Sequence, residues 1–238
     1  MKVRYKQTVI GIAWAILQPL VTMAIFTLIF SKLAKIPSEG LPYPIFAFAA
    51  LIPWTYFSQA LNLSSNSLVV NSNLVTKIYF PRLLIPLAAT VSPLVNLFFS
   101  LLVFLVMMMI YHIIPTWNAL FLPLFLSLAV MTALAVGLWS SALNVRYRDV
   151  GHTVPFLIQV WMYASPIAYP ASMIPEKWRL LYSLNPMVGV VEGFRWALAG
   201  KESPDFPAML ISSLVVASLL LGGLIYFKKM EQYFADVI

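Results

Sequence analysis

Long stretches without a formal charge are the feature that most limits what this chain can fold into. Five such stretches cover residues 7–31, 40–76, 83–145, 150–175 and 206–227. A bilayer core is about 30 Å thick, and a helix needs roughly 20 apolar residues to cross it. Each stretch can supply one span, and 83–145 is long enough for two. We therefore predict an all-α polytopic membrane protein with six transmembrane helices and short interfacial and external helices.

The composition excludes several other classes of protein. Only 10% of the 238 residues are charged, whereas soluble domains have about 25%, so a soluble fold of this size could not cover its surface. The chain has no cysteine, which excludes disulfides and thiol chemistry. Its net charge of +7 suggests anionic lipid headgroups rather than nucleic acid, because the basic residues cluster at the ends of spans.

The spans are predicted at about 9–30, 44–57, 83–111, 119–143, 154–169 and 207–227, within one transmembrane domain covering 1–238. The first is too long for a signal peptide. The distribution of Lys and Arg places both termini in the cytoplasm. This topology puts His112 and His152 on opposite sides, so no metal site is expected. The external helices fall within about 171–203, where Asn185-Pro186 starts a short helix that Gly200 ends.

A short segment at about 71–86 stands out, because Lys77 and Arg82 are the only formal charges between residues 40 and 145. Its apolar residues follow an i to i+4 spacing, and Pro81 ends the helix. We predict an amphipathic helix on the cytoplasmic interface, an elbow between two spans where a partner protein could push.

The chain lacks the residues that several kinds of membrane protein need. No Walker A pattern is present, so the chain should not bind ATP itself. No Ser/His/Asp or paired-carboxylate set converges within the membrane. The predicted spans contain no ionisable residue, which argues against a proton-coupled carrier and most membrane enzymes. Catalytic residues and cofactors are therefore not expected, and energy should come from outside the chain.

Four motifs carry a resemblance to a known family: KVRYKQTVIGIAWAILQPL at 2–20, VTKIYFPRLLIPLA at 75–88, LNVRYRDVGH at 143–152 and LNPMVGVVEGFRWAL at 184–198. In this order they resemble the membrane subunit of ABC-2 type exporters, in particular the polysaccharide, O-antigen and teichoic acid permeases. The resemblance covers essentially the whole chain. That family usually has an amphipathic interfacial helix before the first motif, whereas only Met1 precedes it here.

The resemblance implies a homodimer in the bacterial inner membrane, paired with two copies of a separate ATPase that binds ATP and Mg. The substrate would be a glycan linked to polyprenyl pyrophosphate. The elbow and the second cytoplasmic turn would contact the ATPase through Thr76, Lys77, Ile78, Tyr79, Phe80, Arg82, Arg146, Arg148 and Asp149. The alternative interpretation is that these basic residues only follow the positive-inside rule and contact headgroups.

Aromatic residues make up 14% of the chain, and sugar C–H groups stack on aromatic rings. The side chains expected to line a glycan path are Trp14, Gln18, Phe26, Phe30, Phe156, Trp161 and Tyr163. Packing or lipid contact is the alternative for each ring. Arg4 and Lys6 would attract the pyrophosphate at the cytoplasmic rim.

Two features of the last external helix also invite interpretation. Glu192 and Arg195 are spaced i to i+3, which predicts a surface ion pair of small worth, and the resemblance makes them candidates for an external gate. Gly189 and Gly193 have the GxxxG spacing that allows close helix packing.

Other functions stay open at this point. An ABC-2 exporter of teichoic acid, capsular glycan, a drug or a small lipid would share the same family motifs. An integral membrane glycan or lipid transferase would need polar residues that converge at one membrane face. A secondary carrier is disfavoured because the spans carry no buried charge.

Overall fold

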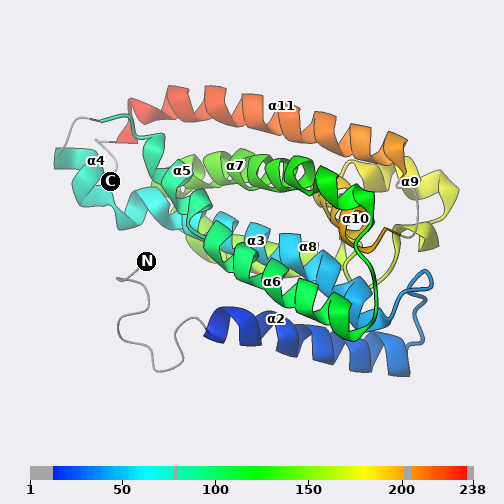
Figure 1. Ribbon diagram of the computed structural model, residues 1–238. Coiled ribbons are helices and arrows are strands. Elements are labelled where there is room, and N and C mark those ends of the chain that lie inside the picture. Colours follow the sequence, from blue (N-terminus) through cyan, green and yellow to red (C-terminus); the bar gives the residue numbers. More distant parts are fainter. Residues whose placement is uncertain (1–12, 78–79, 201–204, 235–238) are drawn as a thin grey trace.

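The computed structural model describes residues 13–77, 80–200 and 205–234, and the side chains of residues 13–16 and 77 are not described. Within these ranges every regular element is a helix. The longer helices run side by side, with α4 at one end of the bundle and α9 at the other (Figure 1). An all-α architecture was the prediction, and it is confirmed.

The first helical unit ends later than the predicted first span. Helix α2 (Ala13–Phe26) continues without a break into the π-helix η1 (Thr27–Leu33). Pro19 lies inside α2. The loop expected from residue 31 therefore begins only after Leu33, and it leads to the central helix of the bundle.

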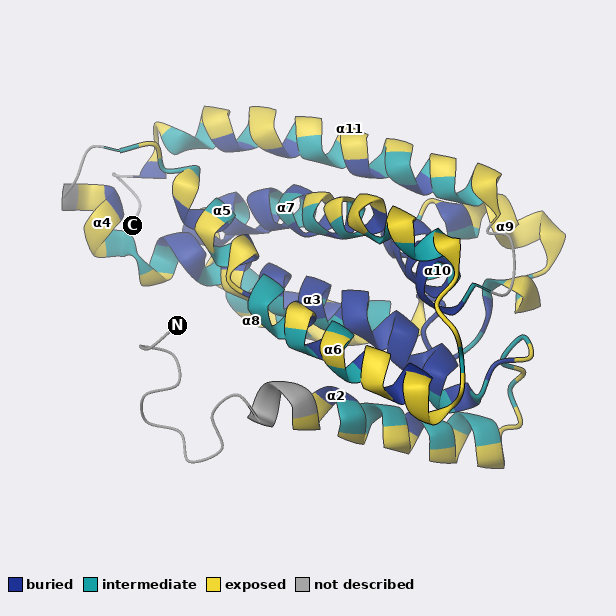
Figure 2. Ribbon diagram, in the orientation of Figure 1, coloured by how far each residue is buried: buried dark blue, intermediate teal, exposed yellow. Residues whose placement is uncertain are grey.

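Helix α3 (Tyr43–Val70) is the most buried element, and it lies at the centre of the bundle (Figure 2). The sequence predicted that after Phe57 the helix would leave the hydrocarbon and enter protein or water. The helix does continue through this Ser- and Asn-rich half, and Ser64, Ser65 and Ser67 are buried in protein. The hydroxyls of Ser65 and Ser67 donate to carbonyls of the preceding turn, at Asn62 and Ser64. The buried Ser64 hydroxyl has no hydrogen-bond partner among the described residues.

The elbow contains one short helix, α4 (Ser72–Lys77). The chain continues into α5 (Leu84–Val91) and α6 (Leu94–Ile110). Asn71 ends α3 and does not cap α4 with its side chain, because its amide donates to Ser67 O. The predicted third span is divided into two helices, and it bends at Pro93, between α5 and α6. Pro86 lies within the first turn of α5, where a proline is tolerated.

The next two elements differ in how well the sequence predicted them. A 3-10 turn, η2 (Trp117–Phe121), leads into α7 (Leu122–Arg146), close to the predicted fourth span. Helix α8 (Val150–Tyr163) starts earlier than predicted and ends at Tyr163 instead of Tyr169. After Tyr163 the N–H groups of Ala164 and Ser165 still bond to the preceding turn. The carbonyls of this segment bond to side chains that are distant in the sequence and do not continue the helix.

The remaining elements follow the local signals closely. A 3-10 turn, η3 (Ala171–Met173), precedes α9 (Glu176–Ser183), α10 (Pro186–Ala199) and α11 (Phe206–Glu231). Asn185 caps α10 by accepting from Met187 N, and Gly200 ends the helix with a φ of 68°. A left-handed residue at this position favours glycine, so both predicted boundaries of α10 are confirmed.

Close packing places α10 against two long helices. A Cβ on Gly189 would lie 2.8 Å from Ser212 Cβ on α11, and one on Gly193 would lie 2.2 Å from the Phe125 ring on α7. The GxxxG spacing therefore permits a close approach, as predicted. The core centres on α3, which packs against α7, and α7 in turn packs against α11.

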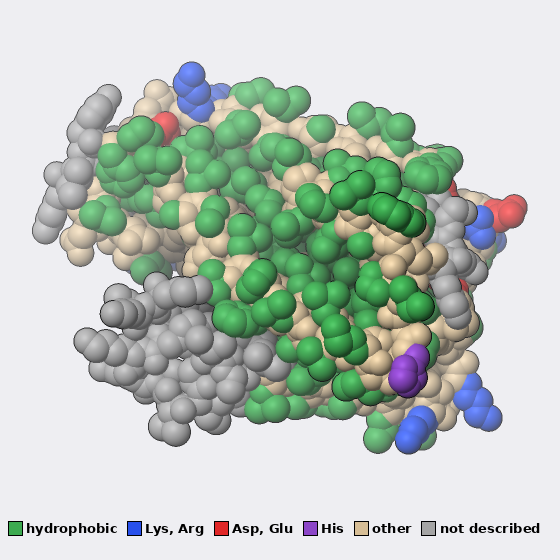
Figure 3. Space-filling model, in the orientation of Figure 1, with side chains coloured by type: hydrophobic (Ala, Val, Ile, Leu, Met, Phe, Trp, Pro, Cys, Tyr) green, Lys and Arg blue, Asp and Glu red, His purple; other side chains and the backbone are tan. Residues whose placement is uncertain are grey.

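Four of the described helical segments are long and apolar enough to cross a membrane: Tyr43–Val70, Leu84–Ile110, Trp117–Arg146 and Phe206–Glu231. The unit formed by α2 and η1, together with α8, adds two further apolar segments, in keeping with the six predicted spans. Hydrophobic side chains cover the middle of the face seen in Figure 3, and the visible charges lie toward its ends. This distribution is typical of a multi-pass membrane protein.

Candidate functional site

The elbow is attached to the bundle by a small apolar cluster. Val75 on α4 is 2% exposed and belongs to a cluster with Ile85 on α5, Phe227 near the end of α11, and Phe234 just beyond that end. Thr76 is exposed, and its hydroxyl donates to Ser72 O. The elbow is therefore seated on the end of α11 and on α5.

Arg82 makes a polar contact between the elbow and α11. Its backbone N–H donates to a Glu231 carboxylate oxygen at 3.2 Å, and its Nη1 donates to Glu231 O. Phe80 is half-buried against the same cluster as Val75. The sequence predicted Arg82 as a contact to a partner ATPase. The structure adds that this side chain already holds a partner within its own chain.

The turn between α7 and α8 presents its charged side chains to the outside. Arg146, Arg148 and Asp149 are all exposed, and the Arg146 guanidinium lies 5.3 Å from the ring centre of the exposed Tyr147. Because α7 runs back toward the end of the bundle that holds α4, this turn and the elbow share that end (Figure 1). The structure thus brings the two predicted coupling segments to one end.

Asn144 fixes this turn, and the sequence analysis did not single it out. The side chain is 2% exposed. Its Nδ2 donates to Ser65 O at 2.9 Å and to Asn66 Oδ1 at 3.1 Å, while its Oδ1 accepts from Gly151 N at 2.9 Å. One amide thus joins α3, α7 and the start of α8. An asparagine between apolar residues at the end of a predicted span was the available signal.

Several predicted site residues lie outside the described part of the chain. Arg4 and Lys6 at the proposed rim, Ile78 and Tyr79 in the elbow, and the side chains of Trp14 and Lys77 belong to this group. Their assigned roles stay predictions.

The predicted lining residues on the first helical unit differ in exposure. Gln18 is exposed. Phe26 is 7% exposed and lies in the core, where its ring meets that of the half-buried Phe30 edge-on at 5.2 Å. Gln18 is therefore on the protein surface, whereas Phe26 faces inward in this conformation.

The predicted lining residues on α8 form a more accessible set. Phe156 is 63% exposed and Tyr163 is 64% exposed. Trp161 is half-buried, meets the Phe57 ring edge-on at 5.1 Å, and donates its ring N–H to Asn185 Oδ1 at 2.8 Å. Helix α8 thus presents Phe156 and Tyr163 to its surroundings, while Trp161 anchors it to the bundle.

Glu192 and Arg195 do form an ion pair, at 2.8 Å, but it is not a surface pair. Arg195 is 5% exposed, and its guanidinium lies 3.6 Å from the ring centre of Phe46. The prediction of a solvated pair of small worth is wrong, because α10 packs these side chains inward between α3 and the chain that follows α8. Their predicted role as an external gate stays a prediction.

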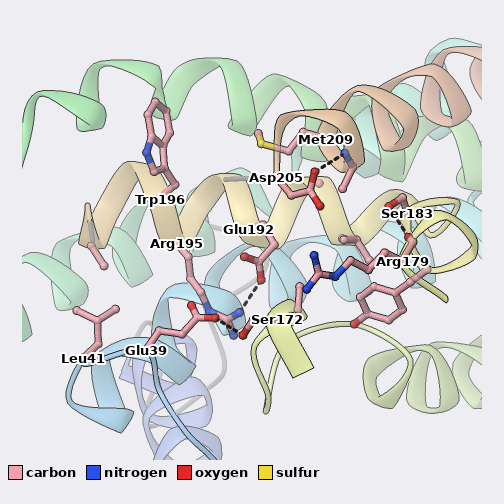
Figure 4. Close-up of a pocket in the computed structure, with 16 residues that line it drawn as sticks. Glu39, Leu41, Ser172, Arg179, Ser183, Glu192, Arg195, Trp196, Asp205 and Met209 are labelled. Carbon is pink, nitrogen blue, oxygen red and sulfur yellow. Dashed lines mark hydrogen bonds and ion pairs between the residues drawn. The ribbon is translucent and has the colours of Figure 1, made fainter. Parts of the chain in front are cut away.

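A cavity of about 180 Å³ lies beside this pair. Figure 4 shows the Arg195 guanidinium directed toward Glu192 on α10 and toward Glu39, in the loop before α3, and Ser172, in η3. Ser172 donates to Glu39 Oε1 at 2.7 Å. Burial raises the pKa of the Glu192 carboxyl above its ordinary value, and the neighbouring Arg195 acts in the opposite direction. This end of the bundle therefore holds a polar cluster that is buried at Arg195 and exposed at Ser172.

The comparison with known families decides the assignment. The family model described as ABC-2 type transporter matches residues 1–199. The chain belongs to the ABC-2 type transporter family. This membership agrees with the resemblance inferred from the four motifs, and it makes the chain a multi-pass membrane subunit with a transport role.

Individual ABC-2 relatives align over nearly their whole length. The O-antigen export system permease protein RfbA of Myxococcus xanthus is 29% identical over 241 residues, covering 100% of this chain and 92% of the relative. RfbA of Klebsiella pneumoniae is 26% identical, covering 100% and 91%. The polysialic acid transport protein KpsM of Escherichia coli is 24% identical, covering 97% and 90%. The similarity therefore points to the polysaccharide export branch of the ABC-2 family.

Proposed function

We propose that this chain is the membrane-spanning permease subunit of an ATP-driven exporter. Its substrate would be a lipid-linked, O-antigen-like polysaccharide, moved from the cytoplasm across the bacterial inner membrane. The observation that carries the proposal is the alignment of relatives named O-antigen export permeases over the full chain. The chain itself performs no catalysis in this proposal.

The working assembly in this proposal is a homodimer with two copies of a separate ATPase, which binds ATP and Mg. The elbow and the exposed turn at Arg146–Asp149 would meet that ATPase, with both termini of the permease in the cytoplasm. The location of these two segments at one end of the bundle supports a shared docking surface (Figure 1).

Force would enter through the elbow residues Thr76, Lys77, Ile78, Tyr79 and Phe80. Arg82 would pass the displacement on to α11, because its guanidinium holds Glu231 O and its backbone N–H holds the Glu231 carboxylate. In this proposal Arg82 acts as an internal link of the permease more than as a direct contact to the ATPase.

The path for the glycan would lie between the two protomers, beside α2 and α8. The exposed rings of Phe156 and Tyr163 suit shallow stacking on sugar C–H groups, which lets a chain slide. Arg4, Lys6 and Lys77 would attract the pyrophosphate at the cytoplasmic rim.

A second candidate substrate has its own observation. The relative named for polysialic acid transport aligns over 97% of this chain. A capsular glycan is therefore the alternative cargo for the same mechanism.

Reconstitution tests the proposal directly. The permease is purified with the ATPase that co-purifies with it, placed in vesicles, and supplied with a polyprenyl-pyrophosphate-linked glycan on the side that holds ATP. We expect ATP-dependent appearance of the glycan on the other side. A double variant, Lys77→Glu with Arg82→Glu, should abolish export.

The matched control reverses two lysines at the opposite end, Lys32 in η1 and Lys35 in the loop that follows it, with Lys32→Glu and Lys35→Glu. This control changes the net charge by the same amount and should retain most export. If the chain formed no stable complex with an ATPase, the proposed function would be contradicted. If both double variants exported equally well, the coupling role would be contradicted.

A further inference from the structure

The end of α8 is a break in helical structure inside the protein. The helix has 14 residues and is about 21 Å long at 1.5 Å per residue, whereas a span needs about 30 Å. The non-helical stretch that follows is buried: Ser165 and Ile167 are 0% exposed and Ala168 is 6% exposed. Buried backbone outside a helix must find hydrogen-bond partners elsewhere.

Three side chains from other elements supply those partners. Tyr43 on α3 donates its hydroxyl to Ala168 O at 2.7 Å, and Arg195 on α10 donates Nη2 to Ile167 O at 3.0 Å. Asn185, which caps α10, donates Nδ2 to Ala164 O at 3.0 Å. Carbonyls that cannot join a helix are thus satisfied by donors that lie far away in the sequence.

Arg195 is held in place more firmly than an ordinary side chain. Burying a guanidinium is expensive unless it is paired and hydrogen-bonded. Here Glu192 accepts from Nη1 at 2.8 Å, and the Phe46 ring lies beneath the guanidinium carbon at 3.6 Å. These partners hold the guanidinium where its Nη2 reaches Ile167 O. Arg195 thereby ties the segment after α8 to α10.

Asn185 closes the arrangement from the other side. Its Oδ1 accepts from both Trp161 on α8 and Met187 N on α10, while its Nδ2 also donates to Ser165 Oγ at 3.1 Å. One amide therefore binds the last turn of α8, the break and the start of α10. Its four bonds orient the amide without ambiguity.

We propose that Tyr43, Asn185 and Arg195 are positioning residues for export, which hold the end of α8 unwound at a fixed place. This inference rests on the proposed function, in which the exposed aromatic face of α8 lies along the glycan path. The break ends that face at Tyr163, so the glycan leaves α8 at this level. The Glu192–Arg195 pair then acts as a permanent anchor of the exit and does not open during transport.

The sharpest test removes one hydroxyl. Tyr43→Phe deletes only the donor to Ala168 O. Tyr56→Phe is the matched control. Tyr56 is also buried on α3, but it donates to Thr90 O at 3.1 Å, away from the break. We expect Tyr43→Phe to speed amide hydrogen exchange over residues 164–170 by about fivefold. Exchange of this segment should be unchanged in Tyr56→Phe.

The same pair of variants is then assayed in the reconstituted complex. Tyr43→Phe should retain ATP hydrolysis and assembly but export severalfold less glycan per ATP, whereas Tyr56→Phe should match the wild type. A lesion that only weakened folding would instead lower the yield of complex and both activities together. Arg195→Lys supplies a second variant, since it keeps the charge for Glu192 but loses the planar fork that also reaches Ile167 O.

Two results would overturn the inference. Unchanged exchange over 164–170 in both Tyr43→Phe and Arg195→Lys would mean that these residues do not hold the break. Faster exchange with unchanged export per ATP would mean that the break does not set the exit. A wild-type complex that hydrolyses ATP but moves no glycan would instead overturn the proposed function, together with the export role of these residues.

Discussion

At the scale of single residues, two asparagine amides, the buried Asn144 and the half-buried Asn185, connect the most separate parts of this structure. Asn144 and Asn185 each join three parts of the chain with one side chain, at opposite ends of the bundle. An asparagine amide has two donors and an acceptor that can take two bonds, so one residue can satisfy several backbone groups. Such residues are costly to replace because each lost bond leaves a buried partner unsatisfied.

Asn144→Ala should destabilise the turn between α7 and α8. It removes the side-chain hydrogen bonds to Ser65 O and Gly151 N, and each lost hydrogen bond costs about 0.5–1.5 kcal/mol. We expect a lower unfolding temperature in detergent and faster amide exchange at Gly151. Asn71→Ala is the matched control, because Asn71 donates only to Ser67 O in its own helix. Equal losses in the two variants would contradict the special role of Asn144.

At the scale of elements, boundaries were predictable where the signal is local and unpredictable where the partner is distant. Asn185 and Gly200 mark the ends of α10 through their own chemistry, and both boundaries were predicted. The end of α8 at Tyr163 depends on donors at Tyr43 and Arg195, which no local pattern connects to it. For the same reason the i to i+3 spacing predicted the Glu192–Arg195 pair but not its burial.

The packing of α10 on α7 predicts the effect of a single methyl group. In Gly193→Ala the new Cβ would lie 2.2 Å from the Phe125 ring, and overpacking of this kind costs about 1–3 kcal/mol. Thermal unfolding should show the loss, and Phe125→Leu in the same chain should restore part of it. Gly222→Ala is the control, since its nearest neighbour is the edge of Trp139 at 3.1 Å. A variant of Gly193 as stable as that control would rule out the close contact.

The contact between the elbow and α11 predicts a local effect of Arg82→Ala. Hydrogen bonds to charged groups are worth about 1.5–3 kcal/mol, so amide exchange over residues 80–85 should rise by roughly tenfold or more. Lys228→Ala, at an exposed lysine of the same end of α11, should leave this exchange unchanged. If Arg82→Ala exchanges like the control, α11 does not hold the elbow.

At the scale of the whole molecule, apolar stretches and charge placement predicted a helical multi-pass membrane protein, because these properties depend on composition along the chain. The identity of the central helix was not predictable in this way. Helix α3 has the most polar residues of the four long spans, yet it is the most enclosed. Its place follows from packing on α7, which only the folded structure reveals.

The topology has a direct test, because the natural chain has no cysteine. Single cysteines at Tyr147 and Leu180, which are 53% and 70% exposed, should react with a membrane-impermeant thiol reagent from opposite sides of the membrane. Ala135→Cys, at a buried position, should not react from either side. Labelling of Tyr147→Cys and Leu180→Cys from the same side would contradict the predicted orientation.

The enclosure of α3 has a consequence for how the protein is made. During synthesis α3 leaves the ribosome well before α7, so the face of α3 that packs against Gly137 of α7 through Ser64 is uncovered when the helix reaches the membrane. We expect α3 to stay at the translocon or beside an insertase until α7 arrives. In a chain carrying Ser64→Cys and stopped after residue 115, the thiol should react with a small reagent, and extension of the chain through residue 148 should protect it. Protection already present in the shorter chain would mean that α3 finds its place without α7.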